Sequence, residues 1–300
     1  MEDNYKILEH PEGKVDLVNA NIKFLDTVTP GFYKAETQSM GFFSICNLVK
    51  DKSIQIPRSA LEISKEYIDL RYINQYFSKT STDLHKKLDI KQKLGILLHG
   101  IQGTGKTTGC YAVAQELIKT HKAIVVTVTR YSEYDYTLGF LNKIKEKTGT
   151  FLSVIIFDEC EEEMREKEAS FKRLLDSSSS LDMNITFFTT NHLHRIPTTI
   201  RDRPSRIKFC TEVGGVQDEE VIYSILDHMN RPIDSEVQLN TTEIKSIVRD
   251  LKGETLDVIK NTFIDKVFEI NYAKKVEKKQ PDLAIDVNVI QEKTEELSQG

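Results

Sequence analysis

One stretch of this chain has the residue types that bind phosphate. Gly100, Gly103 and Gly105 belong to the sequence Gly-Ile-Gln-Gly-Thr-Gly-Lys-Thr, in which Lys106 and Thr107 follow the last glycine. Glycines let backbone N–H groups turn toward bound oxygens, a lysine places a positive charge near the β- and γ-phosphates, and a hydroxyl ligates Mg²⁺. Thr107 is therefore the predicted metal ligand of the loop. The predicted nucleotide-binding residues are Gly100, Gly103, Thr104, Gly105, Lys106, Thr107 and Thr108.

The surroundings of these glycines favour a functional loop over an ordinary glycine turn before a helix. Ile96 to Leu98 is apolar throughout, as in a buried strand, and residues 109–118 are mostly small or apolar, as in a buried helix. A strand that leads into the loop and a helix that leaves it form the context that a phosphate-binding loop requires.

Two acidic residues follow a second apolar run. Val154 to Phe157 predicts a buried strand, and Asp158 and Glu159 come directly after it. Nucleotides bind at the carboxyl edge of parallel α/β sheets. We therefore expect Asp158 to bind Mg²⁺ through water and Glu159 to polarise the water that attacks the γ-phosphate. Glu161 to Glu163 fit a simpler role as favourable charges at a helix N-terminus.

Composition and charge narrow the class of protein. The 300 residues, 39% of them hydrophobic, are enough for two modest domains or one large one. No apolar run reaches the roughly 18 residues of a membrane span. The first residues lack the basic and apolar regions of a secretory leader, so we expect a soluble, cytoplasmic protein. The 4 cysteines lie far apart, which favours free thiols over zinc or disulfides, and the net charge of −5 gives no overall attraction to nucleic acid.

The periodicity of apolar residues predicts an α/β fold with a parallel sheet covered on both faces, because strand and helix patterns alternate through the central region. Residues 59–77 predict a leading helix, and residues 78–89 a polar connection. The predicted parts are a β-rich N-terminal unit (1–58), the α/β nucleotide-binding domain with its leading helix (59–213), a small helical domain (214–273) and a charged tail (274–300).

The N-terminal unit is predicted from short strand and turn patterns. They are Ile22–Leu25, a turn at Pro30–Tyr33, Gly41–Cys46 and an extended piece at Ser53–Pro57.

The two motifs, in this order, resemble those of AAA+ ATPases. The match covers about Leu94 to Val213 and, more loosely, the helical domain. The resemblance implies a P-loop NTPase core, ATP and Mg²⁺ as ligands, ATP hydrolysis, and a homo-oligomer in the form of a hexameric ring.

The resemblance also implies roles for three further residues. Asn191, after Thr189 and Thr190, is similar to the sensor that lies beside the γ-phosphate and the attacking water. Arg203 and Arg206 resemble the arginine fingers that a subunit supplies to its neighbour. The simpler alternative for either arginine is a basic loop that pairs with surface acids.

The chain departs from the AAA+ pattern in two places. Gly253-Glu-Thr-Leu256 stands where many members have a second sensor arginine, so none is assigned, and the classical AAA branch, which also lacks it, is the nearest match. Residues 130–136 lack the pore signature despite three tyrosines, which favours packing or surface roles for them. The N-terminal unit is similar to the β-rich leader of some stand-alone phage-type AAA ATPases.

Three functions remain open from the sequence. The first is an ATP-hydrolysing ring that remodels or moves a protein partner bound by the N-terminal unit. The alternative is a nucleic-acid-associated loader in replication or packaging, and the third is a scaffold that binds ATP without useful turnover. The presence of Glu159, Asn191 and the two arginines argues against the scaffold.

Overall fold

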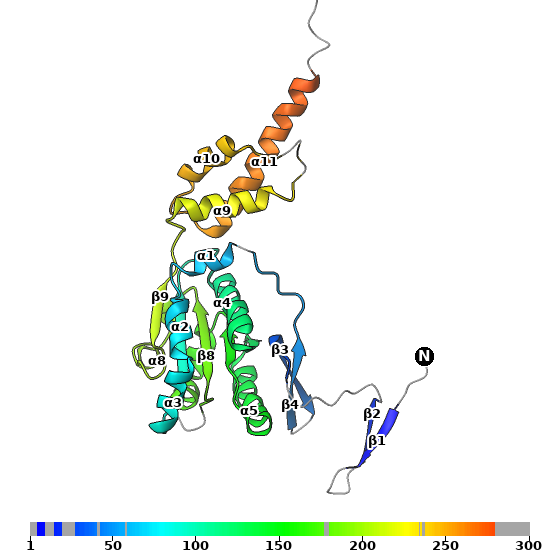
Figure 1. Ribbon diagram of the computed structural model, residues 1–300, viewed down its shortest axis with the longest axis vertical. Coiled ribbons are helices and arrows are strands. Elements are labelled where there is room, and N and C mark those ends of the chain that lie inside the picture. Colours follow the sequence, from blue (N-terminus) through cyan, green and yellow to red (C-terminus); the bar gives the residue numbers. More distant parts are fainter. Residues whose placement is uncertain are drawn as a thin grey trace, which may run out of the picture.

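The computed structural model describes residues 5–9, 15–19, 28–40, 43–57, 59–176, 180–233, 235 and 238–279. An α/β layer and a group of C-terminal helices above it make up most of this part of the chain (Figure 1). No helix among the described residues is long and apolar enough to cross a membrane.

A seven-stranded sheet, in the order β4-β3-β6-β7-β8-β5-β9, forms the centre of the α/β layer. All neighbouring pairs are parallel except β3 with β4. Its strands are β3 (Gly31–Met40), β4 (Phe43–Lys50), β5 (Lys93–His99), β6 (Ile124–Val128), β7 (Ser153–Phe157), β8 (Asn184–Thr190) and β9 (Phe209–Glu212). The predicted α/β fold with a mainly parallel sheet is confirmed.

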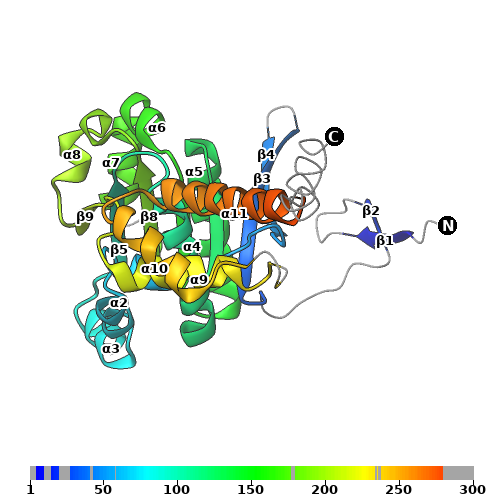
Figure 2. The same ribbon diagram turned by 90° about the horizontal axis from the view of Figure 1, so that it is seen from above.

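Helices cover both faces of the sheet because its strands are apolar on both sides; β7 and β8 are buried at every position. Figure 2 shows α2, α3 and α4 on one side and α5, α6 and α7 on the other. The first side consists of α1 (Ala60–Ser64), α2 (Leu70–Tyr76), α3 (Lys79–Lys87) and α4 (Lys106–His121). The second consists of α5 (Tyr131–Thr148), α6 (Glu161–Glu166) and α7 (Glu168–Asp176).

The segment between β4 and β5 contains three short helices. The predicted leading helix over 59–77 is divided into α1 and α2, and the predicted polar connection over 78–89 contains α3, which Ser78 caps.

Residues 131–136 are the first turns of α5. Tyr134 is 2% exposed and stacks on Phe171, so this tyrosine is a core residue.

The N-terminal region contributes to the central sheet. The predicted turn at Pro30–Tyr33 is wrong, because Gly31 begins β3 and pairs with Ile124 of β6. Two earlier strands, β1 (Tyr5–Glu9) and β2 (Val15–Asn19), form a separate antiparallel pair. Residues 53–57 are not a strand, and the predicted strand Ile22–Leu25 lies outside the described residues.

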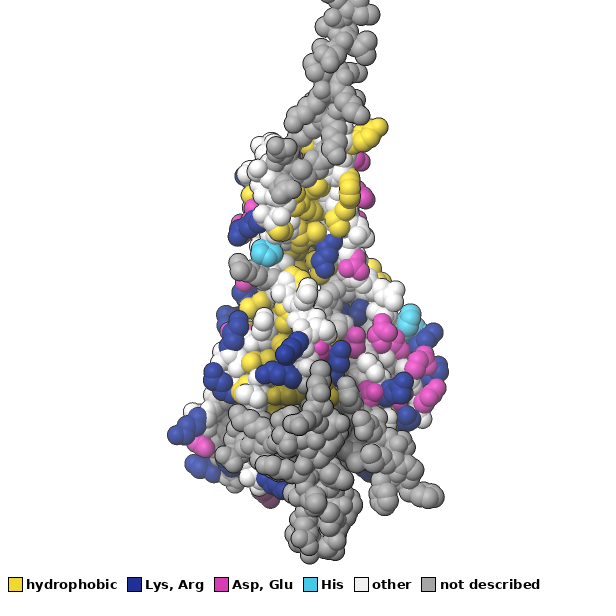
Figure 3. Space-filling view, turned by 90° about the vertical axis from the view of Figure 1, so that its right-hand side faces the viewer, with side chains coloured by type: hydrophobic (Ala, Val, Ile, Leu, Met, Phe, Trp, Pro, Cys, Tyr) yellow, Lys and Arg dark blue, Asp and Glu magenta, His cyan; other side chains and the backbone are white. Residues whose placement is uncertain are grey.

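The lid, as we call helices α9 to α11, has its own hydrophobic core. It consists of α9 (Glu219–Asn230), α10 (Thr241–Asp250) and the long α11 (Leu256–Lys279), which extends six residues beyond the predicted start of the tail at residue 274. Asn240 and Glu243 form the capping box predicted for α10. Figure 3 shows hydrophobic side chains gathered over the lid, and the outer face of α11 exposes Phe268 and Tyr272.

Candidate active site

The phosphate-binding loop joins β5 to α4 and adopts backbone conformations that favour glycine. Gly100 has φ +146° and Gly105 has φ +90°. A Cβ at Gly100 would lie 2.2 Å from the carbonyl oxygen of Val213, which no side chain tolerates. The loop therefore keeps its shape only with glycine here, and it turns directly into the N-terminus of α4, where backbone N–H groups attract anions.

Lys106 is the first residue of α4 and lies inside the loop. Its ammonium group donates to the carbonyl oxygens of Gly100 and Ile101, both at 2.8 Å. The residue is 7% exposed, and burial lowers the pKa of Lys106, although the negative charge of Asp158 opposes this shift. The lysine is thus held in the loop by weak, neutral acceptors that phosphate oxygens can replace.

Asp158 directly follows β7, at the carboxyl edge of the sheet, and contacts the start of α4. The Thr107 hydroxyl donates to Asp158 Oδ1 at 2.6 Å, and the Thr189 hydroxyl donates to the same oxygen at 2.5 Å. The two predicted metal ligands are therefore adjacent. Hydroxyl and carboxylate oxygens are hard ligands, and Mg²⁺ commonly takes few protein ligands besides substrate phosphates and waters. These residues fit Mg²⁺.

Glu159 has a left-handed backbone, φ +48°, which is uncommon for residues other than glycine. The Thr189 hydroxyl accepts a hydrogen bond from the Glu159 backbone N–H at 3.0 Å and so supports this conformation. The Asn191 side-chain amide donates to Glu159 Oε1 at 3.2 Å. The unusual backbone of Glu159 is therefore stabilised by its neighbours, as is common where geometry serves function.

These residues line one cavity of about 200 Å³ between the sheet edge and the lid. Lys106, Thr107, Thr108, Gly103 and Gly105 come from the loop, and Asp158, Glu159, Thr189 and Asn191 come from the strand ends. Leu256, Asp257 and Lys260 of α11 complete the wall, and the Asp257 backbone N–H donates to the Gly103 carbonyl at 3.1 Å. Gly100 and the buried Thr104 shape the loop without lining the cavity.

Arg203 and Arg206 do not line this cavity. They follow α8 (Thr198–Arg201) and share Asp176, at the end of α7, as their ion-pair partner. Arg206 is 6% exposed; its Nε donates to Asp176 Oδ1 at 2.8 Å, and its other nitrogens donate to Asp176 and to the Thr199 carbonyl. The side chain of Arg203 is 60% exposed and makes a single 3.0 Å contact with Asp176.

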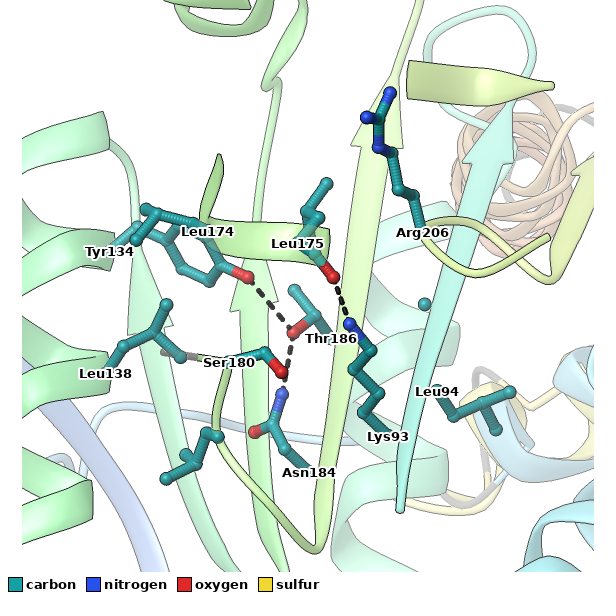
Figure 4. A pocket seen from close by; sticks show the side chains of 12 residues that line it. Lys93, Leu94, Tyr134, Leu138, Leu174, Leu175, Ser180, Asn184, Thr186 and Arg206 are labelled. Carbon is teal, nitrogen blue, oxygen red and sulfur yellow. Dashed lines mark hydrogen bonds between the residues drawn. The ribbon is translucent and has the colours of Figure 1, made fainter. Parts of the chain in front are cut away.

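The surroundings of Arg206 are those of a structural anchor. Together with Lys93 and Leu175 it lines a small cavity under α7, and the Lys93 ammonium donates to the Leu175 carbonyl (Figure 4). The guanidinium of Arg206 lowers the pKa of Asp176 and keeps its carboxylate charged. Of the two arginines, Arg203 is the one placed to reach another molecule.

Thr189, Leu256, Asp257 and Lys260 were not predicted as site residues. A signal for Thr189 existed: β7 and β8 are parallel with Phe157 opposite Phe188, so Thr189 must lie beside Asp158. The three residues of α11 had no such signal, because their position depends on how the lid packs on the loop.

The geometry agrees with what comparison with known proteins shows. Residues 96–214 match the model of the ATPase family associated with various cellular activities (AAA). No curated protein matches the chain. The matched residues include the loop, Asp158, Glu159 and Asn191, which line the cavity together. Residues 96–214 are therefore an AAA ATPase domain, which binds and hydrolyses ATP.

Proposed function

We propose that this protein is an ATP-driven machine that remodels or moves a protein partner and that works as a homo-oligomeric ring. One observation carries the proposal: within the described chain the cavity gathers the groups for binding ATP and activating water, but no arginine lines it. The exposed Arg203 lies elsewhere, beside Asp176. A second copy of the chain that inserted Arg203 would complete the site.

Each residue of the cavity has a role that its position supports. Lys106 and the N–H groups of the loop would bind the β- and γ-phosphates, and Thr107 and Asp158 would hold Mg²⁺. When bound there, Mg²⁺ would neutralise charge that develops on the phosphates. Glu159 accepts a proton from the attacking water, and Asn191 fixes the carboxylate in position.

The proposed ring arrangement follows if an arginine of one subunit completes the cavity of the neighbouring subunit. A head-to-tail contact between loop and cavity repeats around a closed symmetric assembly, and we propose a hexamer. Arg203 is the proposed finger. Arg206 supports the loop through Asp176, which modifies the expectation that both arginines reach the neighbour.

The N-terminal region is the proposed site of partner recognition. Because β3 and β4 belong to the central sheet, a truncation at Ser59 would remove two strands and expose β6. A chain that begins at Pro30 keeps the sheet and removes β1 and β2. We expect this shorter chain to retain ATPase activity and to lose the partner.

The test uses a trapped state. Glu159→Gln should bind ATP and hydrolyse it at least about a hundred-fold more slowly, because an amide cannot accept the proton. We would immobilise this variant with ATP and identify captured proteins by mass spectrometry, with Lys106→Ala as the matched control that cannot bind ATP. An ATP-dependent protein partner that is missing from the control and from the Pro30 chain supports the proposal; wild-type hydrolysis by Glu159→Gln contradicts it.

The nucleic-acid loader predicts a different result. Binding to DNA would weaken steeply as salt rises, because each neutralised phosphate releases counterions. The net charge of −5 disfavours this function. A DNA-binding titration at several salt concentrations distinguishes it from the protein-remodelling function.

A further inference from the structure

We propose that an apolar cavity beside α2 is a binding site for a small, neutral aromatic molecule that regulates the ATP site. The cavity has a volume of about 140 Å³ and shares no lining residue with the nucleotide cavity. Most of its wall is apolar and consists of the side chains of Tyr67, Ile68, Ile73, Ile96 and Phe209.

The cavity lies where α2 packs on β5 and β9, at one edge of the sheet. Ile96 of β5 is paired with Phe209 of β9, so their side chains point to the same face of the sheet. On that face Tyr72 of α2 contacts the Phe209 ring edge-on, with 5.1 Å between the ring centroids. Ile68, Ile73 and Ile96 are at most 3% exposed. The space is therefore bounded largely by buried side chains.

The composition of the wall determines the class of ligand. A cavity of about 150 Å³ lined by aliphatic and aromatic side chains stays dry and binds benzene or xenon, because water finds too few polar partners there. The polar side chains of this wall are Asp69 and Thr211. The Asp69 carboxylate already accepts the backbone N–H groups of Arg71 and Tyr72, which leaves the Thr211 hydroxyl to bond a polar atom of the ligand. The ligand that fits is a single neutral ring with at most one polar group, since a charged molecule would lose its hydration.

Tyr67 connects this cavity to the ATP site. Its hydroxyl donates to the Gly105 carbonyl of the phosphate loop at 3.2 Å. It also lies close to Gly109 of α4, where an added Cβ would be 2.0 Å from the Tyr67 hydroxyl oxygen. The same side chain packs against the hydrophobic core of the lid.

A ligand that packs against the ring of Tyr67 would hold this side chain against the phosphate loop. The loop would then keep the shape that binds ATP, and each ligand would increase the affinity for the other. This coupling rests on the proposed role of the loop in ATP binding.

Binding is tested on the full-length wild-type protein by methyl NMR, with benzene as the probe. Benzene should shift the methyl signals of Ile68, Ile73 and Ile96 in a saturable way, because an aromatic ring current acts at short range. Ile222 and Ile225, in the core of the lid, are controls within the same sample and should not shift. Shifts that do not saturate, or that are equally large in the lid, would overturn the proposed site.

A pair of variants tests the location of the probe. Thr211→Leu fills the cavity from β9 and should abolish the saturable shifts. Thr148→Leu, the same change at an exposed position at the end of α5, should respond to benzene as wild type does. Equal responses of the two variants would place benzene outside this cavity and overturn the proposal.

The effect on the ATP site is measured by calorimetry. ATP should bind about five-fold or more tightly when benzene saturates the wild-type protein. Tyr67→Phe keeps the ring and removes the hydrogen bond to Gly105, so it should still bind benzene but lose this gain in ATP affinity. An unchanged ATP affinity in wild type, or a full gain in Tyr67→Phe, would overturn the proposed regulation. If wild type binds no ATP at all, the proposed function fails, whereas the methyl shifts still decide whether the cavity binds a ligand.

Discussion

The nucleotide cavity and the loop around Arg203 differ in what one chain can do alone. In the cavity, Thr189 joins Asp158 to the backbone of Glu159, and Asn191 donates directly to the Glu159 carboxylate. Thr107 adds a hydrogen bond to Asp158. Around Asp176, two arginines bind one carboxylate, and one of them is buried while the other faces solvent. The cavity already has its side chains in place for a nucleotide. The loop around Arg203 instead presents an exposed cation that does not line the cavity.

This difference indicates a division of labour. A single chain has the groups that bind ATP, because the loop, the metal ligands and Glu159 meet in one cavity. Fast hydrolysis of ATP needs an additional positive charge near the γ-phosphate in the transition state. We infer that a single subunit determines the affinity for ATP. We also infer that the rate of hydrolysis depends on two neighbouring subunits.

The largest expected effect comes from Arg203. Arg203→Ala should lose about 10³–10⁵ in kcat with unchanged ATP affinity, because a finger acts on the transition state of the neighbouring site. Lys106→Ala should be inactive because it does not bind ATP. Mixing the two inactive variants should restore phosphate release, since some interfaces combine an intact Lys106 with an intact Arg203.

The mixing experiment requires proof that mixed oligomers form, which native mass spectrometry supplies. Phosphate release is then measured across a series of ratios of the two variants. Mixed rings without recovered activity at any ratio would show that Arg203 does not act between subunits.

The second effect concerns stability and separates the two arginines. Arg206→Ala should lower the free energy of unfolding by about 2 kcal/mol, because it removes a buried guanidinium that bonds the partly exposed Asp176 and leaves the Thr199 carbonyl without its donor. Arg203→Ala should change it by less than about 1 kcal/mol, since exposed ion pairs contribute little. Urea unfolding of both variants measures the difference, and equal losses would remove the distinction between anchor and finger.

Within the cavity, Thr189→Val tests whether the hydrogen-bond network is needed for rate. The change keeps the shape of the side chain but removes the hydroxyl that bonds Asp158 and the Glu159 N–H. We expect kcat to fall about ten-fold, with ATP affinity little changed. Thr186→Val is a control on the same buried strand, and its kcat should match that of wild type. An equal fall in both variants would indicate general damage to β8.

The smallest expected effect is the pH dependence of the stability that the Arg206–Asp176 ion pair contributes. The pKa of Asp176 is lowered in the folded protein by Arg206, so its ionised form stabilises the fold above the unfolded pKa. This contribution should be lost as pH falls below the ordinary aspartate value of about 3.9. The difference in unfolding free energy between wild type and Asp176→Asn should therefore shrink from pH 5 toward pH 3. A difference that stays constant with pH would contradict the ion pair.

The phosphate loop and the acidic pair could be predicted because their chemistry is local. Gly100 to Thr107 and Asp158–Glu159 are contiguous stretches with fixed spacing, and the apolar strands before them specify the sheet edge where they meet. The α/β fold was predictable for the same reason, since alternating strands and helices allow few arrangements.

Other features depend on long-range packing that no local pattern records. The residues around Arg203 and Arg206 do not reveal that Arg206 is buried and bonds Asp176, 30 residues earlier in the chain. The role of β3 as a neighbour of β6 is equally hidden, because a parallel pairing joins residues about ninety positions apart and no short turn marks it.

The length of α11 has a mechanical consequence. Its first turn contacts the phosphate loop, and its 24 residues span about 36 Å at 1.5 Å per residue. A rigid rod that pivots by about 10° at its first turn moves its far end by roughly 6 Å. At Phe268 and Tyr272, which lie roughly 18 and 24 Å from the start of this helix, the same pivot gives a displacement of roughly 3–4 Å, so a smaller movement at the phosphates would be enlarged through leverage alone.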